Sequence, residues 1–174
     1  SYVADGPARG ISVGMPNGIS YCFDAEKSHV VFGWFGAFMD VGPDRGNGRG
    51  RGGRPNRTLG TRFSVGAGGF PVRIGEKKPS EVQFRGYRRA KKEDVSFRYD
   101  VDGVSVQQKI SPAKAGVGLA YQFTIEDAQS DVTFTVDREQ VNAKATKGKW
   151  NGNELTLTSA EAKSFTVEVM QKYN

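Results

Sequence analysis

Polar and apolar side chains alternate with a period of two residues along most of this chain. Ile19, Tyr21 and Phe23 alternate with smaller or polar neighbours, and the segments 95–101 and 132–136 repeat the pattern. Such alternation places one set of side chains in a core and the other in water, as in a β-strand. The same segments are rich in β-branched and aromatic residues, which strand surfaces favour. The sequence therefore predicts an all-β protein.

Turn residues separate the extended segments. Asn-Gly or Asp-Gly pairs occupy positions 17–18, 102–103 and 151–152, where glycine accepts the positive φ that tight hairpin turns require. Many short strands with frequent turns indicate an antiparallel β-sandwich, and 174 residues without a linker suit one domain over residues 1–174. Residues 159–163 suggest one helical turn. Strands are predicted over residues 9–14, 19–24, 29–35, 61–66, 70–74, 81–88, 94–101, 104–110, 117–125, 131–137, 140–145, 147–150, 154–158 and 164–171.

The segment 41–60 interrupts this pattern and predicts a long Gly/Arg-rich loop between strands. From Asp44 to Arg57 it holds five arginines, one aspartate and no aromatic side chain, which contributes +4 of the formal net charge of +6. The basicity is therefore local and predicts one surface with an anionic partner. RNA-binding Arg/Gly segments are usually repeated and carry aromatics for stacking. An acidic protein, a lipid headgroup or a polysaccharide fits this short copy better, and no nucleic-acid partner is expected.

The candidate partner-binding residues form two basic groups. The arginines of the loop are Arg45, Arg49, Arg51, Arg54 and Arg57. The second group, in and just after the strand predicted over residues 81–88, contains Arg85, Arg88, Arg89, Lys91 and Lys92. If the two groups lie side by side, they form one cationic surface. The alternative is a solvated edge strand, where charges discourage aggregation.

Three aromatic residues are candidates for stacking on a carbohydrate: Trp34, Tyr87 and Trp150. A carbohydrate-binding module needs two or more such rings exposed in a row. The neighbouring rings of Trp34, Phe35 and Phe38 could line a ligand groove, but a strand that crosses the core is the favoured interpretation.

Residues typical of catalysis are few. His29 is the only histidine and Cys22 the only cysteine. Alternation places His29 opposite Val30 and Phe32, so we expect a solvent-facing histidine. Cys22 is expected to be a small structural thiol, since nothing in its surroundings predicts a lowered pKa. An enzyme would need His29 or a pair of acids in a pocket, and we expect none.

Metal and membrane signals are equally weak. No Cys/His cluster has the spacing of a metal site. Paired acids flank two turns and could help hold Ca²⁺, although such pairs are routine turn chemistry; they are Asp40 with Asp44 and Asp100 with Asp102. No apolar run approaches the roughly 18 residues of a membrane helix. We expect no metal, no cofactor and no membrane span.

The order of several motifs resembles a known family. These motifs are Gly6-Pro7-Ala8-Arg9-Gly10-Ile11-Ser12-Val13-Gly14-Met15-Pro16-Asn17-Gly18, Tyr21-Cys22-Phe23-Asp24, Phe32-Gly33-Trp34-Phe35-Gly36, Arg51-Gly52-Gly53-Arg54-Pro55, Phe84-Arg85-Gly86-Tyr87 and Phe97-Arg98-Tyr99-Asp100-Val101-Asp102-Gly103-Val104. They resemble an uncharacterised β domain of large exported c-type cytochrome proteins from planctomycete- and verrucomicrobia-like bacteria, where it accompanies haem-binding and dehydrogenase-like domains. The resemblance implies a periplasmic or extracellular location close to electron-transfer proteins. It assigns no catalytic residue.

These observations predict a non-catalytic exported β domain or accessory subunit. It would dock through its basic loop onto an acidic protein surface, such as a c-type cytochrome or another subunit of an electron-transfer complex. The alternative is a carbohydrate-binding module that recognises a polysaccharide.

Overall fold

The computed structural model describes residues 3–40, 56–91 and 94–173, which form β-strands with short connections. The strands of the first half are β1 (Gly10–Gly14), β2 (Ile19–Asp24), β3 (His29–Asp40), β4 (Arg57–Phe63), β5 (Val72–Ile74), β6 (Val82–Lys91) and β7 (Asp94–Val101). Those of the second half are β8 (Val104–Pro112), β9 (Gly118–Thr124), β10 (Val132–Thr135), β11 (Val141–Ala145), β12 (Lys149–Asn151), β13 (Glu154–Leu157) and β14 (Phe165–Gln171). The described residues also contain one helical element, the 3₁₀ turn η1 (Glu161–Lys163). The all-β prediction is confirmed.

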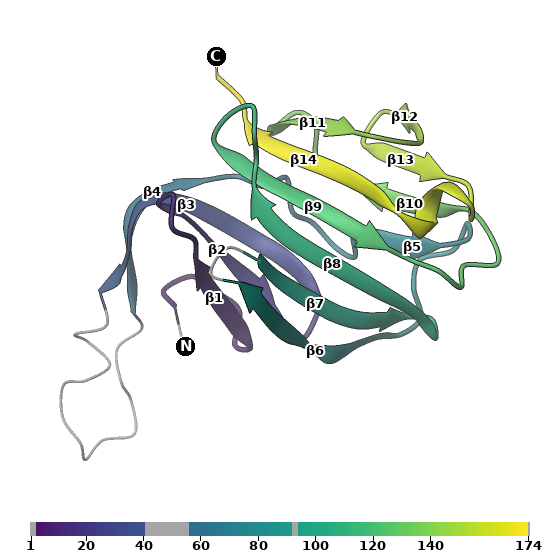
Figure 1. Ribbon diagram of the computed structural model, residues 1–174, viewed down its shortest axis with the longest axis horizontal. Helices are drawn as coiled ribbons and strands as arrows, with labels where there is room; N and C mark the ends of the chain where they lie inside the picture. Colours follow the sequence, from purple (N-terminus) through teal and green to yellow (C-terminus); the bar gives the residue numbers. More distant parts are fainter. Residues whose placement is uncertain (1–2, 41–55, 92–93, 174) are drawn as a thin grey trace.

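The strands form three antiparallel sheets (Figure 1). The β1–β4 sheet has the order β1-β2-β3-β4, the β5–β13 sheet has the order β12-β13-β10-β5, and the six-stranded sheet has the order β11-β14-β9-β8-β7-β6. Strands β6 to β9 are neighbours in sequence and in space, so they form a meander. No helix among the described residues is long and apolar enough to cross a membrane.

The predicted strands and turns agree well with the observed ones. Each predicted range overlaps one strand, and the turn expected at residues 159–163 contains η1. The three Asn-Gly or Asp-Gly turns join β1 to β2, β7 to β8 and β12 to β13. Gly103 shows the cause, because its φ of +81° lies in a region that glycine adopts at little cost.

The loop predicted over residues 41–60 is wrong at its end. Residues 57–60 belong to β4 and pair antiparallel with β3. The Gly/Arg-rich composition predicts a loop here, but pairing with β3 overrides it. Even Gly60 is paired, with Gly36 directly opposite. Residues 41–55, the rest of the predicted loop, lie outside the described residues.

One face of the six-stranded sheet contacts both four-stranded sheets. Phe97 of β7 and Phe123 of β9 share this face, because both lie opposite Gln108 of β8. Phe97 stacks on Phe23 of β2 with ring centroids 3.9 Å apart. Phe123 contacts Phe134 of β10 with centroids 5.4 Å apart. The hydrophobic core therefore lies between the six-stranded sheet and the other two, and aromatic pairs join them.

Strands β3 and β4 extend beyond their sheet at one end, on the left of Figure 1. The pairing of β2 with β3 stops at Phe35, whereas the pairing of β3 with β4 continues as far as Asp40. A φ of +121° at Gly36 and a register shift just beyond it lie within this extension. We call it the β3–β4 arm, residues 35–40 and 57–61.

Candidate functional site

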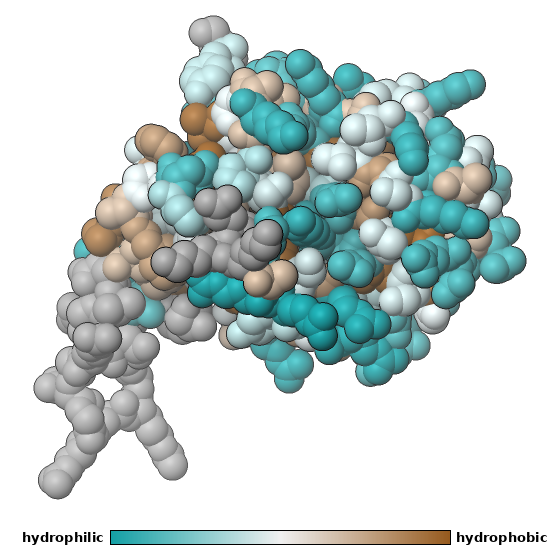
Figure 2. Space-filling model, in the orientation of Figure 1, coloured by the Kyte–Doolittle hydropathy of each residue, from teal (hydrophilic) through white to brown (hydrophobic). Residues whose placement is uncertain are grey.

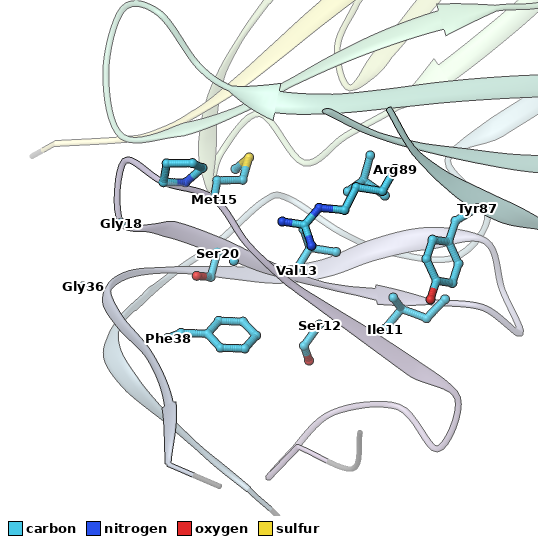
Figure 3. Close-up of a pocket in the computed structure, with 13 residues that line it drawn as sticks. Ile11, Ser12, Val13, Met15, Gly18, Ser20, Gly36, Phe38, Tyr87 and Arg89 are labelled. Atoms are coloured by element: carbon cyan, nitrogen blue, oxygen red, sulfur yellow. The ribbon is translucent and has the colours of Figure 1, made fainter. Parts of the chain in front are cut away.

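A groove runs along β1, the outer strand of the β1–β4 sheet (Figure 3). Its volume is about 650 Å³, which is within the usual range of binding sites. β1 contributes lining residues from both of its faces, Ile11 and Val13 from one and Ser12 from the other. Tyr87 and Arg89 of β6 contribute to the lining from the six-stranded sheet. The groove therefore lies along the outer edge of β1 and reaches both faces of this strand.

Phe38 of the β3–β4 arm lines the groove near Gly14 of β1. A Cβ at Gly14 would lie 2.9 Å from the ring of Phe38, so the absence of a side chain lets the ring approach. Phe38 also stacks on Trp34, with ring centroids 5.8 Å apart. The indole N–H of Trp34 donates a hydrogen bond of 2.7 Å to the Phe38 carbonyl oxygen. Trp34 thus fixes the part of the arm that contributes to the groove.

Tyr87 and Arg89 stand at the edge of the six-stranded sheet, on the face that carries the core. They lie opposite Phe97 and Val95 of β7, whose side chains are buried. The ring of Tyr87 contacts that of Phe97 with centroids 6.1 Å apart, yet Tyr87 is 60% exposed. The core-facing side of β6 is therefore uncovered beside β1, although the same side of β7 is buried.

Large apolar side chains are exposed on the arm and beside the groove. Phe35, Phe38 and Leu59 of the arm are 50%, 42% and 57% exposed. Figure 2 shows apolar atoms, in brown, gathered on the left of the molecule where β3 and β4 lie. With Tyr87, these residues make up four of the five large apolar side chains that are exposed in the described part of the chain. Such gathering is typical of interaction surfaces.

The second basic group lies on the edge strand β6. Arg85 binds the Asp100 carboxylate through two nitrogens at 2.8 Å each, so its charge is already paired. Arg88 and Arg89 are exposed, and no carboxylate of the described residues lies within ion-pair distance of either. Two positive charges therefore remain at or beside the groove.

The first basic group is described only at its last member. Arg57 is exposed at the start of β4, on the β3–β4 arm. The other four arginines lie outside the described residues; they are Arg45, Arg49, Arg51 and Arg54. Lys91 ends β6, and Lys92 also lies outside the described residues.

The three rings considered for carbohydrate stacking do not form an exposed row. Trp34 is 0% exposed and offers no face to a sugar. Trp150 of β12 is half-buried, and the Arg138 guanidinium lies over its ring, 4.5 Å from the centroid. Tyr87 is exposed but belongs to a different sheet from either tryptophan. The condition for a carbohydrate-binding row is not met.

The strand through Trp34, Phe35 and Phe38 was predicted to cross the core, and of these three side chains only that of Trp34 is buried. For Phe35 and Phe38 the prediction is wrong, because pairing with β2 ends at Phe35 and the arm then leaves the body of the sheet. The alternative weighed for this cluster, a role in lining a groove, applies to Phe38.

The prediction of a solvent-facing histidine is also wrong. His29, at the start of β3, is 8% exposed. Its Nδ1 lies 3.0 Å from the Val30 carbonyl oxygen, which can only accept, so Nδ1–H donates. Residues of the β4–β5 connection, among them Val65 and Pro71, line the same small pocket as His29. This connection covers a side of β3 that alternation alone assigns to water.

Acidification from about pH 7.5 to about pH 5 is expected to destabilise the wild type more than a His29→Gln variant. Burial lowers the pKa of His29 below its ordinary value of 6.5, so in this window the unfolded chain binds more protons than the folded one. The free energy of unfolding therefore falls as the pH falls. Urea unfolding at several pH values measures this slope. Because His29 is the only histidine, equal slopes for both proteins would contradict the prediction.

Cys22 of β2 is 0% exposed and lies beside the Ser12 hydroxyl, as expected of a structural thiol. Burial raises the pKa of the Cys22 thiol and keeps it protonated at neutral pH, the form that is a poor nucleophile.

The acid pair at the β7–β8 turn has protein partners. Asp102 accepts hydrogen bonds from the backbone N–H groups of Ser80 and Glu81 at 2.8 and 2.9 Å, and Asp100 binds Arg85. Asp44 of the other pair lies outside the described residues. No group of three His, Cys, Asp or Glu residues that could hold a metal ion occurs within the described ranges.

Comparison with protein-family models, with curated proteins and with solved structures finds no match to this chain. The groove, the arm and the arginines of β6 are therefore the features from which a function can be argued. The β1 side of the groove was missed among the sequence candidates. Its signal is the composition of β1, which reads Gly-Ile-Ser-Val-Gly and carries no charge.

Proposed function

We propose that this protein is a non-catalytic docking domain that binds an acidic surface of a partner protein. In this proposal the two four-stranded sheets form one layer of a β-sandwich and the six-stranded sheet forms the other. The binding surface consists of the groove along β1, the β3–β4 arm and the neighbouring part of β6. The role of the domain is structural, in the assembly of a complex.

The observation that carries the proposal is the gathering of exposed apolar side chains beside arginines at one end of the molecule. Phe35, Phe38 and Tyr87 are aromatic and exposed, and Arg88 and Arg89 have no carboxylate partner among the described residues. Aromatic side chains and arginine are enriched where proteins bind one another. Apolar area contributes affinity, and unpaired positive charge favours an acidic partner and speeds encounter.

The sequence adds further positive charge between the two strands of the arm. The residues between Asp40 and Arg57 in the sequence include Arg45, Arg49, Arg51 and Arg54. With Arg57 these residues account for most of the net positive charge of the chain. Burial of the only histidine and the only cysteine supports a role without histidine or thiol catalysis.

The family resemblance supplies the class of partner and the compartment. We propose a c-type cytochrome or another subunit of an electron-transfer complex, in the periplasm or outside the cell. Recognition by charge suits such partners, because weak and transient redox encounters use small interfaces and electrostatic steering.

Removing the arginines is expected to weaken docking roughly tenfold or more at low salt. The tagged protein would be used to capture partners from an extract of its native cells, and mass spectrometry would identify them. The binding constant would then be measured for the purified partner. One variant replaces Arg45, Arg49, Arg51, Arg54 and Arg57 by alanine, and the other carries Arg88→Glu and Arg89→Glu.

The matched control reverses two charges elsewhere. Lys149 of β12 and Lys163 of η1 are exposed, and a Lys149→Glu, Lys163→Glu variant is expected to bind as the wild type does. Unchanged binding of the five-arginine variant would remove the role of the loop. Unchanged binding of both arginine variants, or a captured partner without an acidic surface, would overturn the proposed function.

A further inference from the structure

We infer that β1 accepts an extended, acidic segment of the partner as a fifth strand of the β1–β4 sheet. This inference rests on the proposed docking function and specifies its binding mode. In strand addition, main-chain hydrogen bonds to a sheet edge provide affinity, and pockets for alternate side chains provide specificity.

The composition of β1 sets it apart from the other edge strands. The described sheets end in β1, β4, β5, β6, β11 and β12. All except β1 contain at least one basic residue, for example Arg62, Arg73, Arg88, Lys144 and Lys149. β1 has no charged residue and no proline, and its register with β2 contains no bulge. Because charges, prolines and bulges are what keep a foreign strand from an edge, β1 is the described edge without such protection.

The backbone of β1 presents hydrogen-bonding groups to the groove. Met15 N–H donates to the Ile19 carbonyl oxygen at 2.9 Å, which sets the phase of the antiparallel ladder with β2. In such a ladder alternate residues point their N–H and C=O groups away from the neighbouring strand, and in β1 these include Ser12 and Gly14. Both residues line the groove, and β2 is the one described strand that pairs with β1. An added strand would use these groups.

The walls of the groove suit the side chains of an added strand. On the core-facing side, they would cover the exposed ring of Tyr87 and reach Val95 and Arg89. On the other side, they would lie beside Phe38. Alternate side chains of a strand point to opposite faces, so both walls are used at once. The walls call for apolar side chains and at least one acid.

The charge of the groove selects an acidic segment. Arg89 is the one charged side chain among the described residues that line the groove, and Arg88, the residue before it, lies on the opposite face of β6. An acid that reaches Arg89 would form a charge-assisted hydrogen bond, which is shorter and stronger than one between neutral groups. A basic segment would be repelled.

Binding of defined peptides to the wild-type protein tests this mode directly. The probe is a fluorescein-labelled peptide of about eight residues in which valine alternates with glutamate, a length typical of strands. Fluorescence anisotropy is expected to show binding, and a peptide with lysine in place of glutamate is expected not to bind. Two further probes carry N-methyl groups on either the valine or the glutamate nitrogens. Because only every second N–H of an added strand faces β1, one set should weaken binding roughly tenfold or more and the other should have little effect.

A pair of variants tests the protein side. Ser12→Pro removes a backbone N–H that points away from β2, at an edge position where proline is tolerated. It is expected to weaken peptide binding roughly tenfold or more relative to Ser12→Ala, which also lacks the hydroxyl but keeps the N–H. If Ser12→Pro does not fold, the N-methylated peptides still decide the question, since they require only the wild-type protein.

The possible results separate this inference from the proposed function. Binding that depends on Arg89 but falls equally with both N-methylated sets would overturn strand addition and leave docking by charge intact. If the protein binds neither an acidic peptide nor the captured partner, both strand addition and the proposed docking function are overturned. Sedimentation analysis tests whether a second copy of this chain occupies the edge of β1. Concentration-dependent dimers that Ser12→Pro abolishes would assign the edge to self-association and would overturn the inference that it binds an acidic segment of a partner.

Discussion

Replacing Phe97 by alanine is expected to lower the free energy of unfolding by about 4 kcal/mol. Phe97 is 0% exposed and stacks on Phe23 across the space between two sheets. It also contacts the rings of Tyr21 and Tyr87. Truncation removes these contacts and leaves a cavity between strands of different sheets, where no single strand can move to fill it.

Urea unfolding monitored by circular dichroism measures this loss. Phe35→Ala is the matched control, because the same substitution at a side chain that is half exposed should cost roughly 1 kcal/mol or less. Phe97→Leu, which keeps much of the volume, should fall between the two. A Phe97→Ala protein as stable as Phe35→Ala would show that the stacked pair does not hold the sheets together.

Replacing Trp34 by alanine is expected to cost about 4 kcal/mol as well, and to weaken the groove in addition. Trp34 is 0% exposed, and its ring stacks on Phe38 while its indole N–H donates to the Phe38 carbonyl oxygen. Without the indole, Phe38 loses the partner that holds it against Gly14. Binding of the acidic peptide should therefore weaken even under conditions where the variant remains folded.

Trp34→Phe separates packing from hydrogen bonding. It retains a ring but loses the donor to the Phe38 carbonyl oxygen, so roughly 1–2 kcal/mol is expected. Trp150→Ala is the control for the loss of a tryptophan, since Trp150 is only half-buried, and its effect should be smaller than that of Trp34→Ala. Equal losses for the two alanine variants, measured by urea unfolding, would contradict the assignment of Trp34 as the anchor of the arm.

The strands were predictable because their signals are local. Alternation and Asn-Gly or Asp-Gly turns depend on residues a few positions apart, and a strand such as β7 has one buried and one solvent-facing side, as the pattern assumes. β2 shows the limit, because all of its residues are buried. Polar Ser20 and Asp24 are buried together with the apolar residues of the strand, which alternation does not predict.

The candidate site was less predictable because it depends on where pairing stops. Phe35 and Phe38 look like core residues in the sequence. They are exposed because β3 pairs with β2 only as far as Phe35. Arg88 and Arg89 were identified from composition alone, because a cluster of basic residues can be read directly from the sequence. The groove itself requires β1 and β6 to come together, although about 70 residues separate them in sequence, and the sequence of one chain does not show this proximity.

The position of β5 in the β5–β13 sheet has a consequence for dividing the chain. β5 spans Val72–Ile74, whereas the other three strands of its sheet lie between Val132 and Leu157. The intervening stretch supplies β6 to β9, four strands of the six-stranded sheet. A break anywhere between residues 75 and 131 would thus leave β5 on one fragment and β10, its pairing partner, on the other. Shorter fragments for partner mapping cannot be cut within this interval without splitting a sheet.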